Sequence, residues 1–304
     1  MNDDSVLAPL ADRYAHWLGL DAAQVVQDRQ EAAQDIRAMP LVLRMERADP
    51  PSWHRAVALA AGVAARICLD ERSEPGGEWH DAVGAYVRGH IRKVTRRARG
   101  AHWAAVQDLP GITVQDAGTQ VRALVPGPVA ELDPRVSRLQ VGGTDVPPDV
   151  PPDEPRSPDE PLAADAGVAP SSALRLWVPI GIPMTVGKAM AQAGHAGMIC
   201  AALLGRDGAA GRTRLARWRD AGYPVVVRRV GAVAWADLAE PLRRDQASAW
   251  TDRGLLAVRD AGFTEVEPGT VTVIARIEGG VSARPTGGEE PKSPHGFDGA
   301  GPPN

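Results

Sequence analysis

Apolar residues in the second half of the chain follow two periods in turn, that of a β-strand and that of an α-helix. Period two or a β-branched run predicts strands at 174–180, 223–230, 255–260 and 270–277. Helices are predicted between them, at 187–204, 212–220 and 235–253. This alternation predicts an α/β fold, a small mixed sheet flanked by helices on both faces.

The first half of the chain repeats this order in weaker form, after an amphipathic helix predicted near 5–18. Segment 41–47 corresponds to 174–180, the alanine-rich segment 54–69 to 187–203, and 115–127 to 259–277. The last pair shares an Asp-Ala-Gly triplet, which begins at Asp116 and at Asp260. We therefore expect a tandem duplication. The alternative is a chance match between two alanine-rich helices and two similar turns.

Proline, glycine and acidic residues mark the expected boundaries between the folded parts. Residues 145–172 are dense in Pro and acids and predict a linker, and residues 279–304 predict a disordered Gly/Pro-rich tail. The folded parts are then 1–144 and 173–278. A length of 304 residues allows two domains of modest size.

Composition narrows the class of protein further. The chain is 44% hydrophobic and 24% charged, which is ordinary for a soluble protein, and its net charge of −4 leaves nucleic-acid contact to a local basic patch. The acidic N-terminus and the lack of an 18-residue apolar run predict a cytoplasmic protein without membrane contact. Cys68 and Cys200 lie in apolar runs and are expected to be buried thiols. We predict no metal, because no Cys/His cluster has zinc-ligand spacing.

Candidate chemistry gathers in the segment Met184–Met198. Lysine occurs only at 93, 188 and 292, whereas 34 residues are Lys or Arg. Lys188, Gln192 and His195 are spaced i, i+4 and i+7, so they lie on one face of the predicted helix. Small residues around them allow a ligand or another backbone to approach closely, and a helix N-terminus favours an anion. The alternative is a solvated Lys188 and a packed His195.

Two segments resemble the class II peptidyl-tRNA hydrolase family. Gly187–Ala196 reads GKAMAQAGHA, similar to the family's GK-x-x-A-Q-x-x-H-A helix, and 260–273 is similar to its DAG-x-T-x-x-x-PG-[ST]-x-TV segment. The resemblance covers about 173–278. It implies hydrolysis of the ester between a peptide and the 3′ ribose of tRNA, without a metal or cofactor.

The resemblance also implies roles for individual residues. Lys188 and Asp260 are the expected catalytic pair. Lys188 would stabilise an oxyanion or phosphate, and Asp260 would orient Lys188 or the attacking water. The residues expected to bind the substrate are Gly187, Gln192, His195, Thr264 and Thr270.

Three departures from the family pattern keep other functions open. Val186 stands where the family commonly has a second lysine, Phe263 where it has Arg or Lys, and Arg276-Ile277-Glu278 where it has IGP. The loss of cations weakens attraction to tRNA phosphates. A tRNA- or RNA-binding protein without catalytic activity is the first alternative, and a protein-interaction module is the second.

The first half of the chain lacks the Gln and His of the family helix, and Asp116 has no lysine partner there, so this copy is expected to be catalytically silent. Because the family forms homodimers, it could stand in for the second subunit as an intramolecular pseudo-dimer. Its basic cluster, flanked by His102 and Trp103, suits a tRNA backbone. The alternative is a solvated face with Trp103 in the core. The cluster consists of Arg92, Lys93, Arg96, Arg97 and Arg99.

Overall fold

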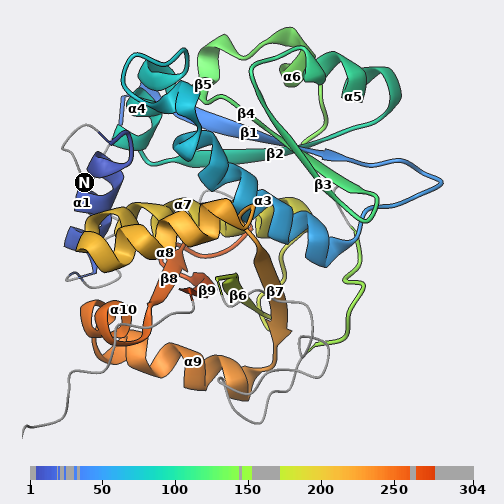
Figure 1. Cartoon of the computed structure of the whole chain (residues 1–304). Helices are drawn as coiled ribbons and strands as arrows, with labels where there is room; N and C mark the ends of the chain where they lie inside the picture. The colour runs from blue at the N-terminus through green and yellow to red at the C-terminus, as the bar shows by residue number, and fades with distance from the viewer. Residues whose placement is uncertain are drawn as a thin grey trace, which may run out of the picture.

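Two mixed sheets, each with its own helices, make up the computed structural model of this chain (Figure 1). The structure describes residues 5–18, 20, 24, 31–32, 35–143, 146–152, 172–260 and 265–277. We call 37–137 the N-terminal unit and 174–277 the C-terminal unit. The N-terminal unit follows α1 (Ala8–Trp17) and has strands β1 (Arg37–Arg44), β2 (Arg92–Ala98), β3 (Gly111–Asp116), β4 (Thr119–Leu124) and β5 (Gly127–Pro128). Its helices are α3 (Trp53–Leu69), α4 (His80–Arg88), α5 (Gly100–Gln107) and α6 (Pro134–Ser137).

The C-terminal unit follows the predicted alternation of strand and helix. Its strands are β6 (Leu174–Pro179), β7 (Val225–Val230), β8 (Leu255–Arg259) and β9 (Val271–Ile277). Its helices are α7 (Val186–Arg206), α8 (Gly208–Asp220), α9 (Ala232–Arg244) and α10 (Gln246–Arg253).

The two sheets have the same topology, as the expectation of a tandem duplication requires. Their strand orders are β2-β1-β4-β3, with β5 added beside β1, and β7-β6-β9-β8. The pairs β1–β2 and β6–β7 are parallel, whereas β1–β4, β3–β4, β6–β9 and β8–β9 are antiparallel. Each unit also runs strand, two helices, strand, helix, two strands, with α10 as an additional helix in the second. The fold is therefore an α/β fold of two similar sheet–helix units, which is consistent with a tandem duplication.

Element boundaries differ from the sequence prediction at three main places, and one of them is the start of α8, which lies at Gly208 rather than at residue 212. The strand predicted at 41–47 is β1, which begins at Arg37 because its parallel pairing with β2 already starts at Ala38. The single helix predicted at 235–253 is broken at Asp245, where the backbone is extended and the carboxylate caps α10 by accepting from the Ala247 and Ser248 amides at 2.9 and 3.1 Å. An N-cap therefore divides a segment whose apolar period is continuous.

Helices α3 and α7 lie between the two sheets, and α5 and α9 lie on the outer sides (Figure 1). One apolar core joins α1, α3 and α7 with the inner faces of both sheets. Smaller clusters fill the space between sheet and helices on each outer side, and Trp103 is buried in the one under α5 and α6. The two units thus share their main core.

The small residues predicted to allow close approach to α7 do so for the backbone of α3. A Cβ atom added at Gly197 would lie 2.2 Å from the carbonyl oxygen of Ala61. Each of the two helices also contacts a strand of the other unit, α3 on β7 and α7 on β2. The glycine therefore sets how closely the units pack.

Candidate functional site

Lys188 and Asp260 form a buried ion pair where α7 begins and β8 ends. Lys188 Nζ donates to Asp260 Oδ2, and the side chains are only 10% and 5% exposed. Thr185 is the N-cap residue of α7 and its hydroxyl accepts from the Lys188 amide at 3.2 Å, which places Lys188 in the first turn. Asp260 is the first residue after β8, and its backbone closes the loop through Thr270 O at 2.9 Å and Gly269 N at 2.7 Å. The two predicted catalytic residues thus lie together, 72 positions apart in sequence.

Gln192 and Thr272 extend this ion pair into a buried polar network. Gln192 Nε2 donates to Asp260 Oδ2 at 2.7 Å, one turn after Lys188 on the same face of α7. Thr272, which is fully buried on β9, donates its hydroxyl to Gln192 Oε1 at 2.6 Å. This bond fixes the amide with its nitrogen toward the carboxylate. Gln192 is therefore a buried hydrogen-bond partner of Asp260, and its side chain does not line an open surface.

The anionic group at the N-terminus of α7 is the side chain of Glu265. Glu265 accepts from the Thr185 amide at 2.9 Å and from the Thr185 hydroxyl at 2.8 Å. The carboxylate lies at the positive end of the helix dipole, where negative charge is stabilised. It ties the β8–β9 loop to the helix three residues before Lys188.

His195 lies two turns after Lys188 and is partly buried against β2 of the N-terminal unit. Its Nδ1 atom is 3.5 Å from the ammonium of Lys93. Burial, with the charges of Lys93 and Lys188 adding to it, holds the pKa of His195 well below its usual value. The imidazole is therefore neutral at physiological pH, and acts as hydrogen-bond donor and acceptor rather than as a cation.

The N-terminal unit also contacts the first turn of α7. Thr95 Oγ1 on β2 donates to the carbonyl of Gly187 at 2.8 Å, so this predicted binding residue is held through its backbone. Thr270, another predicted binding residue, closes the β8–β9 loop through its backbone. Thr264 and Phe263 lie outside the described residues, so what the sequence indicates for them stays a prediction.

The five basic residues predicted to contact tRNA phosphates lie in different environments. Arg92 is paired with Glu31, Arg96 donates to Leu139 O at 2.7 Å, and Arg97 donates to the side chain of Gln140. Arg99 is exposed. Lys93 is buried between the units, which makes it a neighbour of the site rather than part of a surface cluster.

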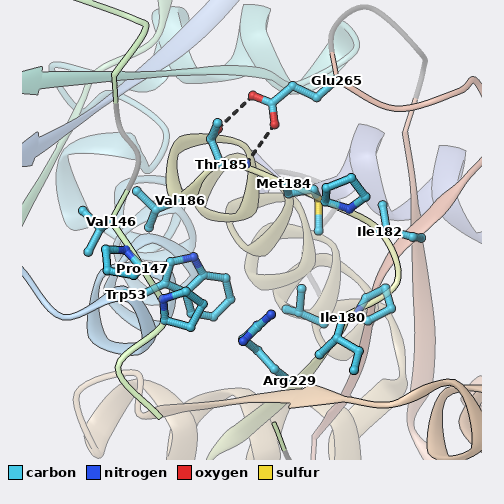
Figure 2. Close-up of a pocket in the computed structure, with 14 residues that line it drawn as sticks. Trp53, Val146, Pro147, Ile180, Ile182, Met184, Thr185, Val186, Arg229 and Glu265 are labelled. Atoms are coloured by element: carbon cyan, nitrogen blue, oxygen red, sulfur yellow. Dashed lines mark hydrogen bonds between the residues drawn. The ribbon is translucent and has the colours of Figure 1, made fainter. Parts of the chain in front are cut away.

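A pocket of about 800 Å³ lies at the junction of the two units, beside the start of α7 (Figure 2). Trp53, Val146 and Pro147 line one side, and the segment from Val178 to Val186 lines much of the rest. Arg229 lies between Trp53 and Ile180 in this view, with its guanidinium 5.7 Å from the Trp53 ring. Val186 and Lys188 are two residues apart on a helix and project about 200° from each other. The pocket therefore lies on another side of α7 from the ion pair.

The N-terminal unit keeps the framework of this site with other side chains. Ser52 caps α3 as Thr185 caps α7, and three residues later Arg55 pairs with Asp116, its Nη1 atom 2.6 Å from Oδ2. Counted from the caps, Leu59 takes the place of Gln192 and Gly62 that of His195. Asp116 therefore has a cationic partner, Arg55, which the comparison of the two halves of the sequence did not identify. The buried polar network of the C-terminal unit has no counterpart around Leu59.

Fold and site together define an α/β protein of two similar units, one of which holds a buried lysine–aspartate pair that also accepts a hydrogen bond from a glutamine. The model of the peptidyl-tRNA hydrolase PTH2 family matches residues 174–277, from the first residue of β6 to the last of β9. The C-terminal unit is thus a PTH2-like unit. Among curated proteins and among solved structures, no match to the chain was found.

Two features of the described residues bear on other functions. No group of three or more His, Cys, Asp or Glu side chains is placed to hold a metal ion within the described part of the chain. Among the helices of that same part, none has the length and apolarity needed to cross a membrane. A cytoplasmic location remains a prediction from sequence.

Sequence reasoning missed Glu265, Thr272 and Thr185, and it misplaced Lys93. Thr272 was detectable in principle, as a polar residue at an inward position of an alternating strand. Thr185 had the signal of an N-cap residue before a helix. Glu265 and Lys93 had no local signal, because their roles arise from contacts with α7 made across 80 and 102 positions.

Proposed function

We propose that this protein hydrolyses the ester between the peptide and the tRNA of peptidyl-tRNA, and that the C-terminal unit carries the active site. The observation that supports this most is the buried Lys188–Asp260 pair at the start of α7, inside the segment that matches the PTH2 family. A small and strongly hydrated ammonium, rather than a guanidinium, suits a single developing oxyanion.

In the proposed reaction a water molecule attacks the ester carbonyl carbon. The carbonyl oxygen becomes negatively charged, and Lys188 stabilises that charge through its ammonium N–H groups. The C–O bond to the 3′ ribose then breaks, one proton of the attacking water passes to the ribose oxygen, the other is released to solvent, and the peptide leaves as a carboxylate. Asp260 holds the ammonium in place and orients the water, and Gln192 keeps the carboxylate fixed through its amide.

Binding of tRNA is proposed to involve the basic side chains at the surface of β2 and after it. Arg99 is exposed, and Arg96 and Arg97 are anchored to the segment after α6 by contacts that hold their side chains in place. Such contacts to phosphates are salt-sensitive. Binding without hydrolysis would be the behaviour of a tRNA-binding protein that keeps the hydrolase fold.

We further propose that the two units act as an intramolecular pseudo-dimer. Helix α3 packs on α7, and the contact of α3 with β7 has its counterpart in the contact of α7 with β2. This reciprocity is what a two-fold interface produces. The N-terminal unit would then take the structural place of a second subunit.

The deciding experiment measures release of tRNA from a peptidyl-tRNA with a blocked amino group, at low and at physiological salt. Wild type should release tRNA, and Lys188→Ala and Lys188→Arg should both fail, with folding checked by circular dichroism. Arg55→Ala is the matched control, because it removes the equivalent cation of the other unit, and it should retain activity. Bound tRNA without release in wild type would favour the binding protein instead.

A further inference from the structure

Lys93 is the one lysine of the N-terminal unit, and it reaches the helix that carries the catalytic lysine. Its side chain leaves β2 and runs alongside α7 at Gly194, where an added Cβ atom would lie 2.7 Å from Lys93 Cδ and 2.9 Å from Cε. Only a residue without a side chain at 194 leaves this path open. The lysine is 9% exposed, so its ammonium ends inside the protein.

The three hydrogens of that ammonium have three acceptors. Lys93 Nζ lies 3.1 Å from Ile91 O, 3.3 Å from Tyr86 Oη and 3.5 Å from His195 Nδ1. The Tyr86 hydroxyl donates its own hydrogen to Ile91 O at 2.7 Å, so its oxygen is available to accept from Lys93. A buried ammonium is costly when one of its hydrogens lacks an acceptor.

This arrangement decides the protonation of His195. An ammonium has no lone pair and only donates, so its histidine contact is a hydrogen bond only when Nδ1 is unprotonated. The proton of the neutral ring then resides on Nε2. The opposite tautomer would turn an N–H toward the ammonium and would leave the third hydrogen of Lys93 without an acceptor.

We propose that Lys93 is a positioning residue of the active site: it holds His195 with Nδ1 as the acceptor, so that Nε2–H is the donor offered on the Lys188 face of α7. His195 then serves as a hydrogen-bond donor to the oxygens of the substrate and not as a base. The N-terminal unit thereby completes the site of the C-terminal unit. This role in the reaction rests on the proposed hydrolase function, whereas the tautomer does not.

The test reads the tautomer of His195 by NMR in the full-length protein with isotope-labelled histidine, below neutral pH and without substrate. Wild type should show the Nε2–H form, with the resonance assigned by its loss in His195→Gln. Lys93→Met, which keeps the apolar side chain as far as Cε and removes the donor, should shift the ring toward the Nδ1–H form. The other histidine resonances report whether the variant is folded.

One further measurement and one substitute variant keep the outcomes distinct. In the hydrolysis assay Lys93→Met should lower kcat by roughly 10- to 100-fold, the effect of one hydrogen bond to a charged group. If Lys93→Met does not fold, Gly194→Ala replaces it, because its added methyl group displaces the lysine side chain. An Nδ1–H ring in wild type, or an unchanged tautomer or kcat in the variants, overturns the proposal. The expected tautomer in an inactive wild type would instead refute the hydrolase function.

Discussion

Arg55 Nη1 lies 2.6 Å from Asp116 Oδ2, at the place in the N-terminal unit that Lys188 and Asp260 occupy in the C-terminal unit. The two pairs differ in burial. The side chains of Arg55 and Asp116 are 44% and 56% exposed, whereas those of Lys188 and Asp260 are almost fully enclosed. The same framework thus holds a solvated ion pair in one copy and a desolvated one in the other, where electrostatic effects are stronger.

This difference predicts unequal coupling energies in two double-mutant cycles. Alanine at Arg55 and Asp116 should give a coupling of about 0.2–1 kcal/mol, as exposed pairs do. Removal of Lys188 alone should lower the free energy of unfolding by roughly 3–5 kcal/mol, because Asp260 is left as a buried charge. Urea unfolding of the single and double variants measures both. Equal coupling energies for the two ion pairs would contradict the conclusion that burial makes them differ.

The Gln192–Thr272 bond predicts a graded loss of function. Gln192→Leu removes a donor to Asp260 and leaves the Thr272 hydroxyl without this acceptor, so the free energy of unfolding should fall by about 1–3 kcal/mol. The proposed ester hydrolysis should fall with it, because the carboxylate keeps its bond from Lys188 but loses the one from Gln192. Thr272→Val removes the hydroxyl, with its contacts to Gln192 Oε1 and Val258 O, but leaves the bond from Gln192 to Asp260, and it should have the milder effect in both assays. A Gln192→Leu protein with wild-type stability and rate would argue against the network.

The approach of α3 to α7 predicts a strong effect at Gly197. Gly197→Ala places a methyl group 2.2 Å from the Ala61 carbonyl, where backbone must move. Overpacking of this kind costs about 1–3 kcal/mol or more, which thermal unfolding would register as a lower Tm. Gly181→Ala is the control, since nothing lies within 4 Å of its added Cβ atom. Similar Tm values for the two variants would mean that the helices do not pack so closely.

Burial lowers the pKa of Lys93 from 10.5 to about 7, which predicts a pH-dependent stability. Above about pH 7 the folded protein releases this proton while the unfolded chain keeps it up to about pH 10, so stability rises with pH by up to about 1.4 kcal/mol per unit. Lys93→Met lacks this contribution. Its stability relative to wild type should therefore be greatest near pH 6 and decline toward pH 9.

The pKa shifts of the neighbours of Lys93 are shared by wild type and Lys93→Met, so their contributions largely cancel in the stability difference. Burial raises the pKa of Cys68 to about 12 and that of Tyr86 well above its usual value, and it lowers that of His195. Urea unfolding of wild type and Lys93→Met across the range measures the difference directly. A difference that does not change with pH would show that Lys93 titrates normally.

Much of the C-terminal unit could be predicted because its signals are local. The period of apolar residues depends on the side chains of one segment, and it located every strand and most helices of that unit within a few residues. The spacing of Lys188, Gln192 and His195 placed them on one helix face for the same reason. Asp245 was the exception, since its cap overrides the period of a single helix.

The sequence by itself thus determined the order of the elements, their repetition in two copies and the helix that carries the lysine. Only the tertiary structure decided that α3 packs on α7 within one shared core, that Glu265 occupies the start of α7, and that Lys93 faces His195. These relationships join segments far apart in the chain. They depend on which surfaces are buried together, and that is a property of the whole fold rather than of any one segment.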